Sequence, residues 1–319
     1  MKLVFLLMAV GAGATPTMFA VAPGEDIAVF REGPADGPVA ILVPGLSGCH
    51  FGFRKLTPML HAQGLRTIVI EPLAVGDSSR PGGHDYTITA QSARIGAVMD
   101  SLGIDQAVFV AQGIGGAMVF RLAVERPDLV TGLISIEAAA SEEAMSPANK
   151  KNLMMAKALI KLGGKSILRK RYLEILEKSS GDTSWLDRRT VGRYYRGIGR
   201  NPLAAMNALT NMTEQAEPWA LVPRLPEIMV PVVVLLGTAP HEGELNSQAV
   251  LDLDRGLRNV EFREIAGAGH FIYEENPQAV ADAVRDLVQK LPASRIPSGA
   301  ALVSGDNGGT DLVQPSDRR

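Results

Sequence analysis

Six short apolar runs, spaced along the chain from Val39 onward, most constrain what this sequence can fold into. Each run is rich in Val and Ile with little alternation of polarity, which is typical of strands buried on both faces of a parallel sheet. The runs are VAILVPG (39–45), RTIVIEP (66–72), AVFVAQG (107–113), GLISIEA (132–138), VPVVVLLG (230–237) and VEFREIA (260–266). Amphipathic stretches between them, such as 87–102 and 118–125, predict helices. Repeated strand–helix units predict an α/β fold with a doubly wound, mostly parallel sheet.

This alternation stops between residues 140 and 226, where no strand-like run occurs. The stretch instead contains helical patterns such as NLMMAKALIKL, RYLEILEK and PLAAMNALTNM. We interpret it as a helical cap inserted over the carboxyl edge of the sheet. Its cluster of Lys and Arg residues fits a solvated helix face; attraction to anionic lipids or substrates is the alternative.

Both ends of the chain differ from the core. Residues 1–17 contain Lys2, an apolar run and small residues up to Ala14, a pattern that predicts a cleaved signal peptide; a buried first strand, or translation from Met18, is the alternative. A genuine signal would make the protein secreted or periplasmic, and otherwise it would be cytoplasmic. No apolar run is long enough to predict an integral membrane span in the mature chain. Residues 292–319 lack periodicity and predict disorder. The core is then expected at 18–139 and 227–291.

Composition excludes several function classes. The chain has 32 basic and 34 acidic residues, a net charge of −2, so nothing in the charge indicates a nucleic-acid partner. Its single cysteine, Cys49, excludes an intramolecular disulfide and argues against a thiolate metal cluster.

Four local motifs follow one another along the predicted sheet. They are LVPGLSG (42–48), EPLAVGDSSRP (71–81), VFVAQGIGG (108–116) and AGAGHFIYEENPQAV (266–280). Together, in this order and spacing, they resemble the cap-bearing α/β-hydrolase superfamily from about Met18 to Leu291. The resemblance implies an oxyanion loop in the first motif, a nucleophile elbow in the third and a catalytic histidine, His270, in the fourth.

The departures from that family concern its catalytic triad. The elbow reads Ala111-Gln112-Gly113-Ile114-Gly115, so Gly113 leaves the nucleophile position without a side chain. Pro240 occupies the position where the family usually has its acid, three residues after Gly237. Glycine adopts the positive φ of the elbow at little cost, so it would suit an enzyme that no longer needs the nucleophile.

The resemblance still implies a site. The amides of Leu46 and Ile114 would form an oxyanion hole, with Gly45 and Gln112 beside them, and His270 would act as base on a water molecule. Glu137, at the end of a strand, is the preferred acid partner of His270, ahead of Glu242 and its neighbour Glu244; a helix-capping role for Glu137 is the alternative.

Other polar residues are poorer candidates. Ser47 and Cys49 lie in the oxyanion loop, on the wrong side for attack assisted by His270. Ser78 and Ser79 are expected to stabilise their turn. The remaining histidines are scattered; they are His50, His61, His84 and His241. Of these, only His241 is expected near the catalytic edge, and without companion ligands it predicts no metal site.

Two functional hypotheses remain open. In the first, the site descends from a hydrolase of small apolar esters, lactones or C–C/C–X bonds, and it still acts as a weak hydrolase or as a lyase, isomerase or cyclase without a nucleophile. In the second, the protein is a pseudoenzyme that binds a small apolar molecule. A remote third reading takes Ala111, Gly113 and Gly116, followed by Glu137, as a dinucleotide fingerprint of an oxidoreductase. We expect no cofactor, and the oligomeric state stays open.

Overall fold

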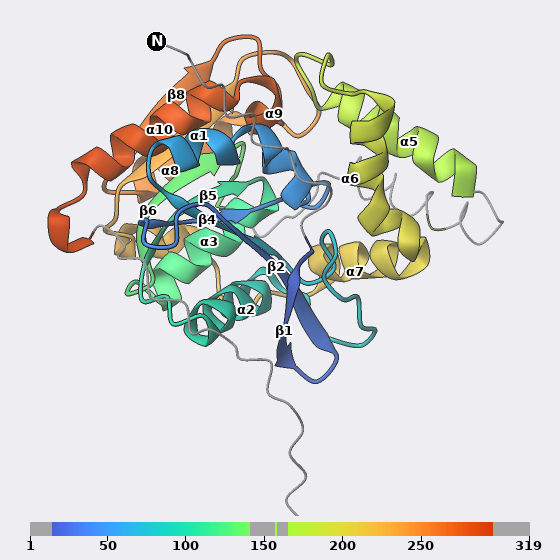
Figure 1. The fold of residues 1–319 in the computed structure, drawn as a ribbon, viewed down its shortest axis with the longest axis horizontal. Helices are drawn as coiled ribbons and strands as arrows, with labels where there is room; N and C mark the ends of the chain where they lie inside the picture. Colours follow the sequence, from blue (N-terminus) through green and yellow to red (C-terminus); the bar gives the residue numbers. More distant parts are fainter. Residues whose placement is uncertain (1–14, 141–156, 158–164, 296–319) are drawn as a thin grey trace, which may run out of the picture.

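The computed structural model describes residues 15–140, 157 and 165–295, and their strands form one eight-stranded sheet (Figure 1). The strand order across the sheet is β1-β2-β4-β3-β5-β6-β7-β8. The strands are β1 (Thr17–Ala22), β2 (Glu25–Glu32), β3 (Val39–Val43), β4 (Arg66–Glu71), β5 (Ala107–Gln112), β6 (Val130–Ile136), β7 (Val232–Gly237) and β8 (Val260–Ile265). Strands β3 to β8 pair in parallel, whereas β1 and β2 pair in antiparallel fashion.

The six apolar runs coincide with β3 to β8, so the predicted α/β fold with a mostly parallel sheet is confirmed. Burial on both faces holds for the central strands β3, β4, β5 and β6, in which every residue is buried. It is wrong for β8, whose residues are mostly half-buried. That strand lies at the end of the strand order and pairs only with β7, so its outer side has no neighbouring strand to cover it.

Helices cover both faces of the sheet. The buried side chains of α2 (Ile88–Ser101), α3 (Ile114–Glu125), η2 (Val222–Glu227) and α8 (Ser247–Gly256) join one apolar cluster with alternate strand residues such as Ile41 and Phe109. The other cluster joins Leu42 and Val108 to η1 (His50–Lys55), α1 (Thr57–Ala62), α9 (Ile272–Glu275) and α10 (Pro277–Lys290). A final turn, η3, spans Ala293–Arg295. Strand residues of opposite parity thus supply the two cores.

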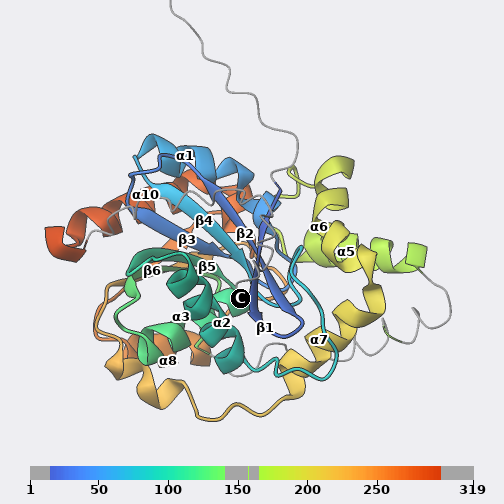
Figure 2. The same ribbon diagram turned by 60° about the horizontal axis from the view of Figure 1, so that its bottom comes forward.

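Between β6 and β7, the described residues are helical, in α5 (Lys165–Lys178), α6 (Arg188–Arg200) and α7 (Pro202–Glu214). These helices lie together at one side of the sheet, coloured yellow-green to yellow in Figures 1 and 2. The asparagine side chain of Asn201 accepts a hydrogen bond from the amide of Ala204, which caps the start of α7 where Pro202 stands as its first residue.

Several predicted segments lie wholly or partly outside the described residues. The signal peptide falls mainly in 1–14, most of NLMMAKALIKL falls in 152–162, and most of the predicted disordered tail falls in 296–319. Among the helices that the structure does describe, none is both long and apolar enough to cross a membrane.

Candidate functional site

The predicted site residues follow neighbouring strands at one edge of the sheet. Leu46 follows β3, Gly113 follows β5, Glu137 follows β6 and His270 comes five residues after the end of β8. Strands β3, β5, β6, β7 and β8 are parallel neighbours in the strand order, so their carboxyl ends meet at this edge. This is the edge at which ligands bind in open α/β sheets.

Gly113 makes the sharp turn from β5 into α3. Its φ of 54° and ψ of −128° lie in a region that favours glycine, and its amide donates a 2.9 Å hydrogen bond to the carbonyl of Ile136. Helix α3 begins directly after this turn, at Ile114, four residues earlier than the predicted start at Met118. The helix N-terminus therefore lies against the turn, which apolar periodicity alone did not indicate.

The turn brings Gly113 and His270 together. A Cβ atom built on Gly113 would lie 3.3 Å from Nε2 and 3.6 Å from Cε1 of His270, and apart from the chain neighbours of Gly113 no other described residue comes within 4 Å of it. The imidazole thus faces the space that a side chain at position 113 would fill.

The first loop is held by Gln112. The side-chain oxygen of Gln112, itself buried, accepts a 3.1 Å hydrogen bond from the amide of Gly45. The side chain of Leu46 packs against α7 residues Ala205, Met206 and Leu209. Ile114 is the first residue of α3, so its amide has no acceptor inside the helix. Gln112 and Gly45 therefore shape the loop; ligand binding by these residues, Leu46 and Ile114 stays a prediction.

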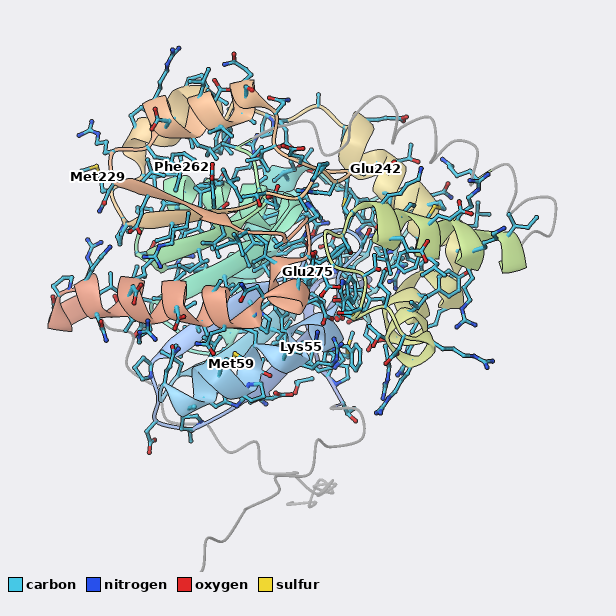
Figure 3. All side chains as sticks on the ribbon, turned by 90° about the horizontal axis from the view of Figure 1, so that it is seen from above. Lys55, Met59, Met229, Glu242, Phe262 and Glu275 are labelled. Carbon is cyan, nitrogen blue, oxygen red and sulfur yellow. The ribbon has the colours of Figure 1, made fainter. Side chains whose placement is uncertain are left out.

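His270 is fixed by the segment that follows α5. Its amide donates a 2.8 Å hydrogen bond to the carbonyl of Ser179. The carboxylate of Glu275, labelled in Figure 3, accepts hydrogen bonds from the amides of Gly269, Gly181 and Asp182. Burial, and to a lesser extent the nearby His241, lower the pKa of His270 to about 4. The imidazole is therefore neutral near neutral pH, as a general base must be.

Glu137 lies at the edge but does not form a hydrogen bond with His270. Its backbone has a φ of 46°, unusual for a side chain other than glycine, and its Oε1 accepts a hydrogen bond from the amide of Gly237. Its other oxygen, Oε2, lies 3.5 Å from Nε2 of His241. A carboxylate oxygen of Glu137 also lies within 4.8 Å of a ring nitrogen of His270, so Glu137 stands beside both histidines, and its role as the acid partner of His270 stays a prediction.

His241, which the sequence placed near the catalytic edge without a role there, lies beside Glu137 in the site. Its side chain is fully buried, and its Nδ1 donates to the carbonyl of Ala239 at 2.7 Å. Burial lowers the pKa of His241. The Glu137 carboxylate and the Ala239 carbonyl raise that pKa by more, so it lies above the usual value for histidine. One sequence feature could have indicated a role for His241 in the site: it directly follows Pro240, the residue at the usual acid position of the resembled family.

The other acidic and nucleophilic candidates lie in less suitable surroundings. Glu242, labelled in Figure 3, pairs with Lys178 at 3.3 Å on the surface, where its side chain is 43% exposed. Burial raises the pKa of the Cys49 thiol far above its usual range, so it stays protonated and is a poor nucleophile. The carbonyl of Ser47 accepts a hydrogen bond from the hydroxyl of Tyr172.

The remaining predicted polar residues have structural partners. The hydroxyls of Ser78 and Ser79 accept hydrogen bonds from the amides of Ala28 and Asp26, so they tie their loop to β2. The scattered histidines are each engaged elsewhere: His50 stacks on Phe30, His61 contacts Thr67 and His84 pairs with Glu25.

The glycines of the third motif have packing roles. A Cβ on Gly116 would come within 2.3 Å of the Cβ of Ala138, and one on Gly115 within 2.8 Å of the carbonyl oxygen of Val43. Both glycines let α3 approach the ends of the neighbouring strands, so packing accounts for the small-residue pattern without a dinucleotide.

Comparison with known proteins fits this geometry. A family model described as the alpha/beta hydrolase fold matches residues 38–277. The chain is 27% identical to the magnesium-chelatase 30 kDa subunit of Rhodobacter capsulatus, covering 82% of this chain and 90% of that protein. It is 23% identical to the sn-1-specific diacylglycerol lipase ABHD11 of Mus musculus, covering 81% and 83%. The solved structure of the epoxide hydrolase CorEH is similar at a TM-score of 0.70 and 18% identity, covering 86% of this chain and 98% of that one.

Proposed function

Because this chain belongs to the α/β-hydrolase fold family, we propose that it hydrolyses a small apolar ester or lactone with water as the nucleophile. One observation carries the proposal: Nε2 of His270 lies 3.3 Å from the position that a Cβ of residue 113 would take. In this proposal His270 is the base at the elbow, because Gly113 offers no side-chain atom to attack the substrate. A water molecule in that space would be within reach of the imidazole.

The chemistry needs only groups at this edge. The neutral imidazole of His270 takes a proton from water as the hydroxide oxygen attacks the ester carbonyl carbon. The amides of Leu46 and Ile114 would donate to the oxyanion that forms. When the carbon–oxygen bond to the leaving group breaks, Nε2 returns the proton to the departing alkoxide. Such a site without a nucleophile retains a rate enhancement of about 10³–10⁴ over water.

Apolar side chains beside the first loop support an apolar substrate. Leu46, next to the predicted oxyanion hole, packs with Ile198 of α6 and with Met206 and Leu209 of α7. A lipase is among the relatives, which fits an ester with an apolar acyl or alcohol group.

A second candidate is binding without catalysis. Its support is the position of Glu137, whose two oxygens face Gly237 and His241, and the buried Nδ1 of His270, which has no hydrogen-bond partner among the described residues. In that arrangement no described carboxylate is hydrogen-bonded to the His270 imidazole to orient it, as the acid of a catalytic triad does. A ligand could occupy the same pocket with no reaction.

The two candidates are separated by esterase assays on p-nitrophenyl acetate and butyrate, run in the presence of EDTA. We expect wild-type hydrolysis above the buffer rate and a loss of about 10²-fold in His270→Ala. His84→Ala, which removes a histidine paired with Glu25 away from the site, is the matched control and should retain the rate.

Two results would count against the proposal. A wild-type rate equal to buffer would favour binding alone. Equal activity in folded wild type and His270→Ala, with folding checked by circular dichroism, would remove His270 from the mechanism.

A further inference from the structure

Three side-chain atoms converge beside His270 from three different loops. Glu137, His241 and His270 each offer one ligand atom, and these three atoms lie within 4.8 Å of one another. Oε2 of Glu137 is 3.5 Å from Nε2 of His241. The three residues follow β6, β7 and β8 in turn. Within the described residues, no hydrogen-bond partner reaches the buried Oε2 of Glu137, Nε2 of His241 or Nδ1 of His270. Buried polar atoms normally form hydrogen bonds, so three buried atoms without a partner, on three residues this close together, need an explanation.

The contacts around His241 and Glu137 make Nε2 of His241, in its neutral form, and Oε2 of Glu137 hydrogen-bond acceptors. A backbone carbonyl can only accept, so the 2.7 Å contact with the Ala239 carbonyl places a proton on Nδ1 of His241. The Nε2 atom of the neutral ring then carries a lone pair. The amide of Gly237 donates to Oε1 of Glu137 and fixes the carboxylate with Oε2 turned to His241. No described group forms a hydrogen bond with either acceptor or with Nδ1 of His270, and a cation among them would bind all three, displacing the proton of His270 from Nδ1.

We propose that Glu137, His241 and His270 form a binding site for a divalent transition-metal ion, with Zn²⁺ as the ion to test. Two imidazoles and one carboxylate are a donor set that suits zinc and leaves a fourth position open. Both supporting contacts, the Ala239 carbonyl on His241 and the Gly237 amide on Glu137, are the kind that orient metal ligands. For bonds of about 2.0–2.2 Å, each ligand atom needs to move inward by less than about 1 Å.

Protonation of His241 is the simplest competing explanation. An imidazolium there would pair with Glu137 across the 3.5 Å gap and satisfy two of the three atoms. It would leave Nδ1 of His270 buried without an acceptor or donor among the described residues and would place a positive charge beside it. A metal ion satisfies all three atoms. No metal was expected from the sequence because His241 has no companion ligand nearby along the chain; the fold brings Glu137 and His270 beside it.

Metal binding would change what His270 offers to the elbow. An imidazole that coordinates through Nδ1 in its neutral form keeps its proton on Nε2. That nitrogen faces Gly113, so the loaded protein would present an N–H donor there where the metal-free protein presents a lone pair. The metal would therefore suppress hydrolysis by His270. The binding site itself does not depend on the proposed function.

Binding is measured on the full chain, stripped with EDTA, dialysed and titrated with Zn²⁺ by calorimetry. Co²⁺ is used in parallel, for its visible ligand-field absorption. We expect one ion per chain and an affinity lowered by at least about tenfold in His241→Gln and in Glu137→Gln. Glu137→Gln keeps an oxygen for the Gly237 amide, so it tests the charge with little structural change. His84→Gln is the control and should bind as wild type does.

Thermal unfolding provides a second measurement that does not depend on activity. Zn²⁺ should raise the Tm of the wild type and of His84→Gln but not that of Glu137→Gln. The proposal is overturned if the wild type binds no ion, or if His241→Gln and Glu137→Gln both bind as tightly as wild type. If hydrolysis is absent but Zn²⁺ binds as expected, only the proposed function fails; if hydrolysis is found without metal binding, only this inference fails.

Discussion

Gly113 shows how one residue can keep the geometry of a site and remove its chemistry. Its φ of 54° is the conformation that turns β5 into α3, and a side chain there would cost about 1–3 kcal/mol in strain. The glycine avoids that cost, while His270 still faces the turn. Sequence motifs predicted the places of Gly113 and His270, since both lie in short local patterns. They did not predict the pairing of Glu137 with His241, because that contact joins two loops about a hundred residues apart in the chain.

We therefore expect Gly113→Ser to gain esterase activity, on the order of 10²-fold, by placing a hydroxyl beside Nε2 of His270. The imidazole must yield by a few tenths of an ångström to admit the new Cβ. The matched control is Gly113→Ala, which carries the same strain without the hydroxyl. Both variants should lose about 1–3 kcal/mol in urea unfolding. Equal p-nitrophenyl butyrate rates in the two variants would contradict the prediction.

Among the structural elements, the connection after α5 links the helical segment to the site. Residues 178–182, here called the strap, bind the two late loops: the carbonyl of Lys178 accepts from the amide of Glu242, and that of Ser179 accepts from His270. The strap approaches so closely that a Cβ on Gly269 would come within 2.5 Å of the amide nitrogen of Gly181. Periodicity predicted helices in this region but could not predict which loops they contact, since such contacts depend on tertiary packing.

Removing the Glu275 carboxylate should loosen the strap. In Glu275→Ala, the amides of Gly181, Asp182 and Gly269 lose their shared acceptor, and we expect the free energy of unfolding to fall by about 1.5–3 kcal/mol. Glu264→Ala, an exposed glutamate of β8, is the control and should change stability by less than about 0.5 kcal/mol. Urea titration measures both. A loss no larger than that of the control would show that the strap is held by other contacts.

For the molecule as a whole, the mostly parallel sheet and the positions of β3 to β8 follow from the sequence, because buried runs of Val and Ile mark the parallel strands; the order of the strands across the sheet comes only from the structure. The antiparallel pair β1 and β2 was not among those runs, since β1 is largely exposed and polar residues begin and end β2. A buried ion pair between Glu25, at the start of β2, and Arg94 connects these two strands to helix α2. The partners lie 69 residues apart in the chain, so no local pattern could indicate them.

That ion pair should make stability depend on acid. The hydrogen bonds from Arg94, and then from His84, hold the pKa of Glu25 below its usual value despite burial. A carboxyl group with a lowered pKa in the folded state stabilises the fold above its unfolded-state pKa of about 4.3, and the contribution is lost as pH falls through the folded value. Urea unfolding of wild type should show this loss below about pH 4.3.

In Glu25→Gln the same pH step should be smaller, and stability near neutral pH should be lower by about 3 kcal/mol, because Arg94 stays buried without its anion. Glu227→Gln, which alters an exposed pair with Arg224, is the comparison variant. An identical acid profile in wild type and Glu25→Gln would show that other carboxyl groups dominate the transition.

The strap also bears on how a ligand can enter. Because the main chain of His270 is bonded to Ser179, any opening that lifts the end of α5 would drag the imidazole away from Gly113. Ligand entry on that side would therefore move His270 away from the elbow each time a ligand bound. Entry past Leu46 and the apolar side chains of α7 would instead leave the hydrogen bond between His270 and Ser179 intact.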